Sequence, residues 1–331
     1  MAQFVSGVSA PGIVGLDSAG RGGAGGGWLP AGVDEMMRRW LLKVLTAALV
    51  TGAVTAGWFW PVPGNFVYYL SWRLTTRAPV TTGNINFNGA HIHYVTYGAG
   101  KPVLLLHGGL SNRLSWFSQV PWLVKAGRKV ILVDTRGHGE STLGHTGLSY
   151  HLFAQDVIQV LDKLDIAQTD IIGWSDGGII ALLLGRDAPQ RVGKIVAISA
   201  NFDPSGLTSD AGAGLQVEAA APSGGVWQWL QGWWSGAGEH YPTLASKIRH
   251  LWRTEPRFTQ ADLQAIHAPV LVIVGERDMI TLEHSAQLAQ WLADGELAVI
   301  KGAGHSAPVT HAAAVDGLVG AFLGNIPQSF L

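Results

Sequence analysis

Residues 173–177 read GWSDG and place a serine, Ser175, between two glycines. They follow the apolar residues 171–172 and open a stretch with a helical pattern. A serine at a sharp turn from strand to helix stands clear of the backbone, and that strained turn accepts only minimal side chains two positions before and after it. Gly173 and Gly177 meet this requirement. The pattern predicts a serine hydroxyl that attacks acyl carbon atoms.

A serine nucleophile needs an imidazole to accept its proton and a carboxylate to orient that imidazole. Asp278 ends the segment GERD at 275–278, after one apolar run, and His305 ends GAGH at 302–305, after the next. The carboxyl ends of parallel strands meet at one edge of a sheet. We therefore expect the side chains of Asp278 and His305 to gather there with Ser175.

The elements that must hold these residues alternate between strand and helix. Apolar runs predict strands at 91–97, 102–106, 129–134, 170–174, 194–199, 269–274 and 296–300. Helical patterns lie between most of them, at 150–164, 178–186, 282–292 and 311–323. This alternation predicts an α/β fold, a mainly parallel sheet with helices on both faces. Residues about 201–266 interrupt it and are expected to form a helical cap over the serine.

The order of these motifs resembles that of the α/β-hydrolase-fold serine hydrolases. The resemblance covers about residues 86–325 and includes HGG at 107–109 and DTRGHGES at 134–141, each after an early strand. It implies that Ser175 is the nucleophile, His305 the general base and acid, and Asp278 the orienting carboxylate. Independent motifs in the right order are more specific than any one of them.

The same resemblance extends to the groups around the triad. It implies an oxyanion hole formed by the backbone N–H of Asp176 and that of Gly109 or Gly108. Some relatives carry the acid after the strand that follows the elbow helix, which makes Asp203 the alternative acid. His107 and the turn at 136–139 are expected to build loops rather than to react. Relatives that open epoxides or remove halogens place Asp at the elbow, so their chemistry is not expected.

Asp176 and the tryptophans carry the expectations about substrate. A carboxylate at a helix start interacts well with the helix dipole, yet an unpaired anion there would oppose the oxyanion. The side chain is therefore expected to point away or to meet a cation. Residues 173–178 resemble the elbow of valacyclovirase-type α-amino-acid ester hydrolases, where the equivalent acid holds the substrate amino group. A cationic amino ester is one candidate substrate, and Asp176 and Trp174 are candidate substrate contacts.

The cap carries five tryptophans, four of them at 227–234. In a helix, Trp229 and Trp233 fall on one side while Trp227 and Trp234 fall on the other. One face is expected to pack on the core and the other to line the acyl or leaving-group pocket, so Trp229 and Trp233 are candidate substrate contacts. A plain hydrophobic lid and contact with a membrane surface are the alternatives.

Residues 1–85 are expected to lie outside the hydrolase domain. Residues 1–36 are rich in Gly, Ala and Ser and are predicted to be disordered. Residues 41–59 contain one charge, Lys43, and are long enough to cross a bilayer of roughly 30 Å. We predict that residues 37–62 form a membrane anchor, with a cleaved signal segment or a soluble helix as alternatives. Residues 63–85 are predicted as a linker, and 86–331 as the hydrolase domain.

Location follows from the charges at the anchor. Arg38 and Arg39 precede the span and Lys43 lies near its start, and these charges predict that the remainder is exported, to the periplasmic or extracellular side. Cleavage of the segment would instead secrete the protein. The sequence leaves the oligomeric state open.

Composition excludes several classes of function. A net charge of −1, with no Lys/Arg cluster in the folded part, disfavours nucleic-acid binding. Without cysteine there is no disulfide or thiol nucleophile, and no His/Asp/Glu group has metal-ligand spacing, so no metal or cofactor is expected.

The expected activity is cleavage of small, largely apolar esters or lactones through an acyl-enzyme, with a small-molecule acyl compound as partner. A cofactor-free perhydrolase or haloperoxidase, a C–C bond hydrolase, and a non-catalytic binding protein of this fold are the alternatives.

Overall fold

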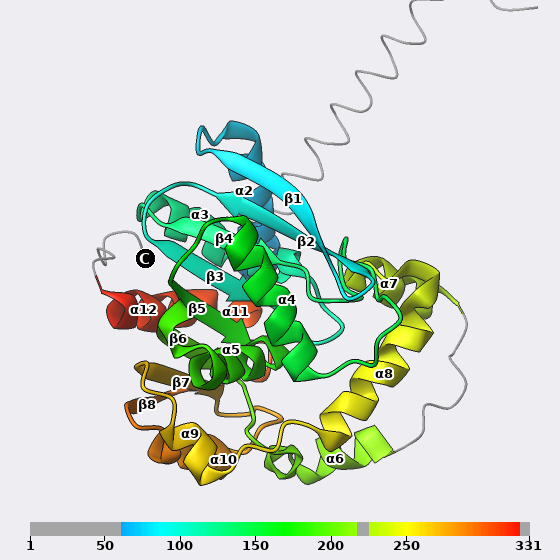
Figure 1. Ribbon diagram of the computed structural model, residues 1–331, viewed down its shortest axis with the longest axis vertical. Coiled ribbons are helices and arrows are strands. Elements are labelled where there is room, and N and C mark those ends of the chain that lie inside the picture. The colour runs from blue at the N-terminus through cyan, green and yellow to red at the C-terminus, as the bar shows by residue number, and fades with distance from the viewer. Residues whose placement is uncertain (1–60, 217–224, 325–331) are drawn as a thin grey trace, which may run out of the picture. The chain divides into compact units, whose positions relative to one another are not determined.

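In the computed structural model, which describes residues 61–216 and 225–324, an eight-stranded sheet forms the centre of the molecule (Figure 1). Its strand order is β1-β2-β4-β3-β5-β6-β7-β8. The pairs β1·β2 and β2·β4 are antiparallel, and the remaining pairs are parallel. The strands are β1 (Val80–Phe87), β2 (Ala90–Tyr97), β3 (Pro102–Leu106), β4 (Lys129–Val133), β5 (Thr169–Trp174), β6 (Val192–Ile198), β7 (Val270–Gly275) and β8 (Gly295–Ile300).

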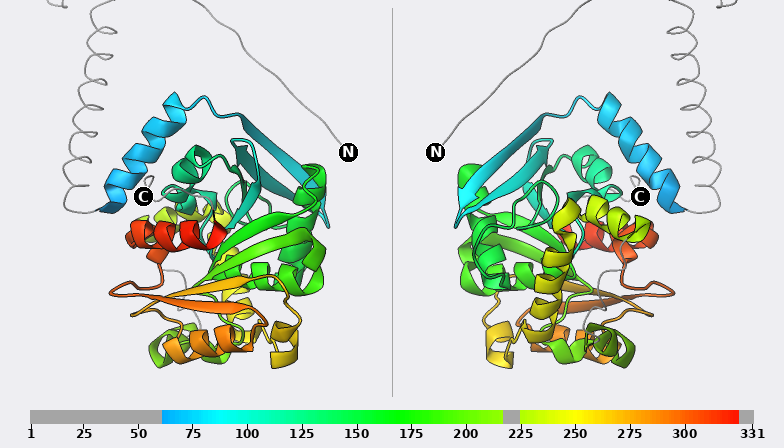
Figure 2. Two further views of the ribbon diagram at one scale, coloured as in Figure 1. Left: turned by 90° about the vertical axis from the view of Figure 1, so that its left-hand side faces the viewer. Right: turned by 90° about the vertical axis from the view of Figure 1, so that its right-hand side faces the viewer.

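Helices cover both faces of the sheet, and the alternation of side chains along β3 shows why. Leu104 and Leu106 pack in one buried layer, whereas Val103 and Leu105 pack in the other, as the two-residue period of a strand requires. Each fully buried aliphatic side chain of this kind stabilises the fold by about 1.5–3 kcal/mol. The first layer contains α4 (Tyr150–Lys163), α5 (Asp176–Asp187) and α10 (Leu282–Trp291). The second contains α2 (Pro61–Thr75), α3 (Gln119–Lys125) and α12 (Ala312–Leu323), and Figure 2 shows these layers from two sides.

The α/β fold class and the seven predicted strands are confirmed, with small differences at the strand ends. The prediction of a linker over residues 63–85 is wrong, because these residues form most of α2 and of β1. The prolines at 61 and 63 lie in the first turn of α2, where a missing N–H costs no helical hydrogen bond. The strand β1 was missed because it is an edge strand whose residues are mostly polar and exposed.

The cap lies between β6 and β7, as expected. It contains α6 (Ser209–Gln216), α7 (Val226–Ser235), α8 (Tyr241–Thr254) and α9 (Gln260–Gln264). Phe258 N donates to Phe202 O over 2.9 Å, so the chain leaves and rejoins the core at one point. At the other end of the cap, Gly139 N donates to Ser235 O over 2.6 Å, which attaches the end of α7 to the loop after β4.

The predicted disordered segment 1–36 and residues 37–60 of the predicted anchor lie outside the described residues. Among the helices that the structure describes, none combines the length and the apolar character that crossing a bilayer requires.

Candidate active site

Ser175 lies between the end of β5 and the start of α5 with φ 54° and ψ −118°, a left-handed conformation that a serine rarely adopts. The flanking glycines make this turn possible. A Cβ at Gly173 would lie 2.2 Å from Gly177 O, and a Cβ at Gly177 would lie 2.0 Å from Leu106 O. Both distances are far shorter than any real contact, so the turn requires glycine at both positions.

The three predicted triad residues meet at the carboxyl edge of the sheet. His305 Nε2 lies 3.0 Å from Ser175 Oγ, and His305 Nδ1 lies 2.8 Å from Asp278 Oδ1. Asp278 follows β7, and His305 follows β8. With Nδ1–H donating to the carboxylate, Nε2 carries the lone pair that can accept the serine proton.

The carboxylate of Asp278 is held by further donors. Oδ2 accepts from Ser199 Oγ over 2.6 Å, and Oδ1 accepts from Ile280 N over 3.2 Å. Burial raises the pKa of Asp278, but the hydrogen bond and charge of His305, with those of the other donors, lower it more, so the pKa lies below its usual value. Asp278 therefore stays ionised behind the imidazole.

The loop after β3 lies directly against the elbow. A Cβ on Gly108 would be 3.2 Å from Ser175 Cβ, so the loop backbone passes close to the nucleophile. Asp176 is the first residue of α5, and its N–H therefore has no acceptor within the helix. The predicted oxyanion donors, Gly109 N–H and Asp176 N–H, thus belong to two backbone segments that meet beside Ser175.

Two buried histidines fix this loop. His138 Nε2 accepts from Leu110 N over 2.9 Å, and His107 Nε2 accepts from Thr135 N over 3.0 Å. Burial lowers the pKa of His107 to about 4 and that of His138 to about 3, so both rings are neutral at pH 7. They act as they were expected to act, as parts of loops.

With this geometry in view, the similarity to known proteins is specific. Residues 101–220 match the family model of the alpha/beta hydrolase fold. The non-heme chloroperoxidase of Streptomyces lividans is 30% identical, over 68% of this chain and 92% of the relative. The chain belongs to the α/β-hydrolase family. A 2-hydroxymuconate semialdehyde hydrolase from Pseudomonas is 28% identical, over 68% of this chain and 88% of that enzyme. The solved structure of an N-acyl homoserine lactone degrading enzyme superposes with a TM-score of 0.60 at 27% identity, over 72% of this chain and all of that one.

Asp176 lies beside the nucleophile of this hydrolase and is 4% exposed. Its Oδ1 accepts from Tyr150 OH over 2.9 Å and from Trp252 Nε1 over 2.8 Å. Its Oδ2 is buried and has no hydrogen-bond partner among the described residues. Burial raises the pKa of Asp176 to about 6, although the two hydrogen bonds and the nearby His305 lower it. Among the residues that the structure describes, the side chain thus meets neutral donors and no cation.

A cavity of about 390 Å³ lies in front of Ser175. Trp174 lines it and also donates from Nε1 to His305 O over 2.7 Å, which ties the histidine loop to the elbow. The other walls combine backbone of the oxyanion loop with large apolar side chains. The residues that line the cavity are Gly108, Gly109, Leu110, Ser111, Ser115, Trp174, Ser175, Trp234, Trp252, Met279, His305, Ser306 and Val309.

Two predicted substrate contacts lie elsewhere. Trp229 and Trp233 are 65% and 67% exposed, and they line a separate hollow with Gly238 and Glu239. The assignment of these two tryptophans to the substrate pocket is therefore wrong. Trp234, about 100° round α7 from Trp233, lines the cavity in their place.

Sequence reasoning also missed Trp252 as a cavity residue. The sequence pattern of α8 could have identified it. Trp252 directly follows Leu251, the last residue of the apolar stripe Leu244, Ile248 and Leu251, and therefore lies at the edge of the buried face.

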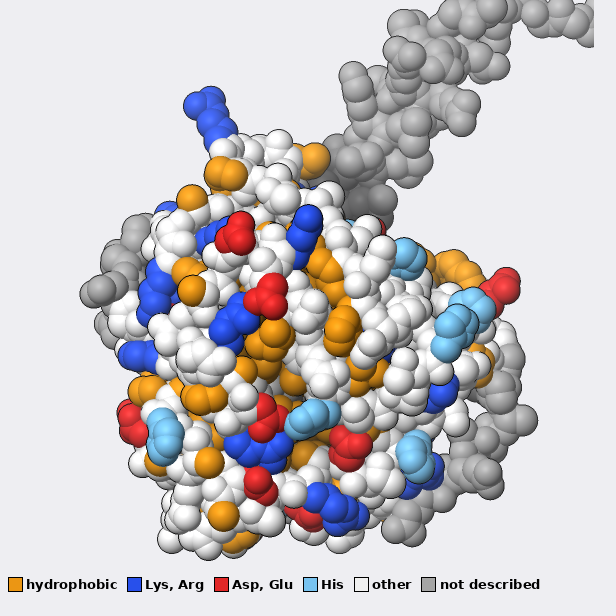
Figure 3. All heavy atoms as spheres, in the orientation of Figure 1, with side chains coloured by type: hydrophobic (Ala, Val, Ile, Leu, Met, Phe, Trp, Pro, Cys, Tyr) orange, Lys and Arg blue, Asp and Glu red, His pale blue; other side chains and the backbone are white. Residues whose placement is uncertain are grey.

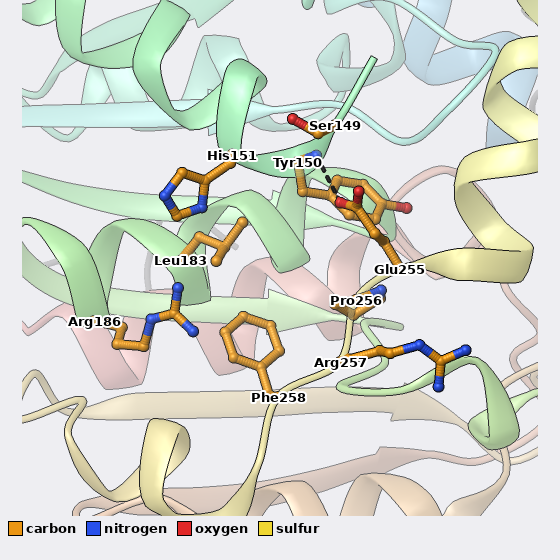
Figure 4. A pocket seen from close by; sticks show the side chains of 9 residues that line it. All are labelled: Ser149, Tyr150, His151, Leu183, Arg186, Glu255, Pro256, Arg257 and Phe258. Atoms are coloured by element: carbon orange, nitrogen blue, oxygen red, sulfur yellow. Dashed lines mark hydrogen bonds between the residues drawn. The ribbon is translucent and has the colours of Figure 1, made fainter. Parts of the chain in front are cut away.

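A third hollow, of about 260 Å³, contains no triad residue (Figure 4). Its charged side chains already have partners. Arg186 Nη1 lies 3.1 Å from Asp262 Oδ1, and Glu255 Oε2 accepts from Tyr150 N over 3.1 Å. Arg257 pairs with Asp203, which also accepts from Ser205 N. Asp203, the alternative acid, is therefore engaged outside the triad, and Asp278 lies behind His305 instead.

The described residues contain no group of three or more His, Asp or Glu side chains arranged to hold a metal ion. On the face shown in Figure 3, positive and negative side chains are interspersed and form no large field of one sign.

Proposed function

We propose that this hydrolase cleaves small, largely apolar esters or lactones through an acyl-enzyme intermediate. One observation carries the proposal, namely the hydrogen-bonded series in which Ser175 Oγ lies 3.0 Å from His305 Nε2 and His305 Nδ1 lies 2.8 Å from Asp278 Oδ1. Nucleophile, base and orienting acid are then in contact before any substrate arrives, and that arrangement favours acyl transfer.

The reaction would run in two halves. His305 Nε2 accepts the proton as Ser175 Oγ attacks the carbonyl carbon, and Asp278 stabilises the imidazolium that forms. The N–H groups of Gly109 and Asp176 donate to the oxyanion. His305 then protonates the leaving alkoxide, which departs. Water attacks the acyl-enzyme in the second half, with His305 again as base, and releases the acid and Ser175.

The cavity supports the proposed size and polarity of the substrate. About 390 Å³ accommodates a compact ester or lactone, and the Trp234, Trp252 and Val309 side chains favour an apolar acyl or leaving group. The similarity to a lactone-degrading enzyme at 27% identity agrees with this substrate class.

Two other reactions would use the same residues. The relative of 30% identity is a non-heme chloroperoxidase, and that of 28% identity is a hydrolase of 2-hydroxymuconate semialdehyde. Perhydrolysis, in which peroxide replaces water as the second nucleophile, and C–C bond hydrolysis are therefore the alternative activities, and both are assayed beside esters. A non-catalytic binding protein is the alternative from a different class.

Labelling with a fluorophosphonate probe tests the proposal directly. The wild type should react, and Ser175→Ala should not. His305→Ala should lower kcat by on the order of a millionfold while the circular dichroism spectrum is retained. His267→Ala, which changes an exposed histidine, is the matched control and should react like the wild type. Failure of the wild type to react would favour a binding protein over an enzyme.

An α-amino ester is a second candidate substrate, supported by the unpartnered Oδ2 of Asp176. An ammonium group could satisfy that oxygen. The p-nitrophenyl ester of valine should then have a higher kcat/KM than its desamino counterpart, and Asp176→Asn should remove the difference. Equal rates with both esters in the wild type would contradict this role.

We also propose, from the sequence of residues 37–62, that the protein is anchored in a membrane with the catalytic domain on the exported side. Retention of the full chain in the membrane pellet after alkaline carbonate washing, with cleavage by protease added outside intact cells or spheroplasts, is the expected result. Release into the wash would count against the anchor.

A further inference from the structure

The cap helix α7 presents an unusual surface to solvent. Val226, Trp229, Leu230 and Trp233 share one side of this helix, and their exposed fractions are 74%, 65%, 38% and 67%. Trp227, at the first turn, is 66% exposed. We call Val226, Trp229, Leu230 and Trp233 the tryptophan face. Figure 3 shows hydrophobic side chains at the edge of the molecule over this helix.

The opposite side of α7 is small and polar where it meets the protein. Gly232 and Ser235 are its buried residues, and Gln228 and Gln231 are half-buried. A Cβ at Gly232 would lie 2.4 Å from Gly238 O, so the helix packs too closely there for a larger side chain. The more apolar side of α7 therefore faces away from the protein. An ordinary surface helix packs its apolar side on the core instead.

The core holds α7 in this orientation. Asn112 Nδ2 donates to Trp234 O, and Gly139 N donates to Ser235 O over 2.6 Å. These bonds come from the loops after β3 and β4, which also build the active site. The tryptophan face is thus a fixed part of the surface, and it needs an apolar partner from outside, because clustered exposed tryptophans mark interaction sites.

The tryptophan face is adjacent in the chain to a residue of the active-site cavity. Trp234, one residue after Trp233 and about 100° further round the same helix, lines the cavity. A partner that covers the tryptophan face would therefore lie next to the route by which substrate reaches Ser175.

The chain that precedes the described residues indicates what this partner is. Residues 41–59 contain one charge and end two residues before α2, which begins at Pro61. The helix α2 contacts α11 (Ala307–Thr310), whose Val309 lines the cavity. In Figure 2 the Pro61 end of α2 lies beside α11 and α12. A bilayer anchor would thus join the catalytic domain near the mouth of its cavity.

We propose that the tryptophan face docks on a lipid bilayer and that the substrate is an acyl compound dissolved in that membrane. Indole rings favour the headgroup region, where their apolar rings are shielded and their N–H groups stay hydrated. An uncharged helix with an outward aromatic side fits this environment. The inference rests on the proposed esterase function and specifies its substrate class.

A single labelled cysteine tests the docking. The chain contains no cysteine, so Leu230→Cys introduces a unique site on the tryptophan face. Leu297→Cys on the edge strand β8 is the matched control, since Leu297 is 40% exposed and Leu230 is 38% exposed. Each full-length variant carries an environment-sensitive fluorophore and is reconstituted singly into phosphatidylcholine nanodiscs with or without doxyl-labelled lipid. Quenching by the doxyl lipid should be at least several-fold stronger at position 230 than at 297.

Activity provides the second readout. The double variant Trp229→Gln/Trp233→Gln should lower kcat/KM for a long-chain ester dissolved in the bilayer by roughly tenfold or more, since apolar contact with lipid is lost. Its kcat/KM for a water-soluble acetyl ester should not change. Leu74→Gln, which removes an apolar side chain that is 88% exposed at the other end of α2, should leave both rates unchanged.

The outcomes separate this inference from the proposed function. Equal quenching at both positions overturns the docking, whether or not esters are cleaved. Shielding of position 230 without lipid quenching would mean that a second copy or residues 41–59 cover the tryptophan face, and would also overturn it. Strong quenching at position 230 with no ester cleavage would retain the docking and reject the esterase.

Discussion

Ser199 Oγ donates to Asp278 Oδ2 over 2.6 Å, on the side of the carboxylate opposite to His305. Ser199 directly follows β6, and its own N–H donates to Ile273 O over 2.7 Å. The acid of the triad is therefore fixed on both oxygens, by the base on one side and by the end of a neighbouring strand on the other. This second hydrogen bond orients the carboxylate toward the imidazole.

We expect Ser199→Ala to weaken this arrangement without removing it. Asp278 would lose one donor, and kcat should fall by roughly three- to tenfold, the effect of about 1 kcal/mol. The pKa of Asp278 is below its usual value, so the carboxylate stabilises the fold above its unfolded pKa, and this stabilisation is lost as the pH falls. The acid unfolding midpoint should accordingly move to higher pH. Ser285→Ala is the control, because the buried Ser285 Oγ has no partner among the described residues.

The oxyanion loop should not tolerate a methyl group at Gly109. A Cβ there would lie 2.4 Å from Asp176 Oδ2 and 2.7 Å from Trp252 Cζ2. Displacement of the loop should cost on the order of a hundredfold in kcat, as loss of an oxyanion donor does. Esterase kinetics measure this. Gly147→Ala is the control, because a Cβ at this exposed glycine has no neighbouring atom within 4 Å, and it should leave kcat unchanged. Full activity of Gly109→Ala would contradict the assignment of Gly109 to the oxyanion hole.

Asp176 should make stability depend on pH. Its pKa is about 6 in the folded protein against a usual 3.8, so the folded state holds a proton that the unfolded chain has released. Stability therefore decreases as the pH rises from about 4 to 6, by up to about 3 kcal/mol. The Asp176→Asn variant, which cannot ionise, should gain stability relative to the wild type between pH 4 and pH 8. Urea unfolding across this range measures the gain, and a constant difference would contradict the raised pKa.

A buried ion pair outside the triad offers a test of stability. Arg136 and Asp156 are 0% and 1% exposed and pair through both nitrogens Nε and Nη2. Asp156→Ala would leave a buried guanidinium without its carboxylate and should lower the free energy of unfolding by about 3–5 kcal/mol. Asp162→Ala removes the exposed partner of Arg191 and should cost less than about 1 kcal/mol. Urea denaturation compares the two.

The residues of the triad could be predicted because their signals are local. Gly173 and Gly177 identify the turn, Asp278 follows the fully buried strand β7, and His305 follows the short apolar run of the edge strand β8. Their meeting point then follows from the geometry of a parallel sheet. Strands buried on both faces, such as β3 and β4, are the easiest elements to read from sequence.

The cap could not be predicted in the same detail, because the direction of an amphipathic helix depends on its neighbours. The sequence of α7 shows tryptophans on both sides. The close approach of Gly232 to Gly238 O, with the hydrogen bonds from Asn112 and Gly139 to the end of the helix, sets which side faces the protein. Similarly, nothing local in residues 80–87 distinguishes the polar edge strand β1 from a linker. Its pairing with β2 becomes evident only with the hairpin turn at Asn88 and Gly89, both of which have positive φ.

The hydrogen bond from Phe258 N to Phe202 O joins the two ends of the cap where the chain leaves and rejoins the core. Everything between these residues is one excursion from the sheet, and the nucleophile, acid and base all lie outside it. Exchange of this excursion for that of another family member would therefore replace Trp234 and Trp252 in the cavity wall and leave Ser175, Asp278 and His305 in place. Substrate preference can thus change during evolution without a change in the three residues that react, provided that the new cap again supplies a donor to Asp176 Oδ1.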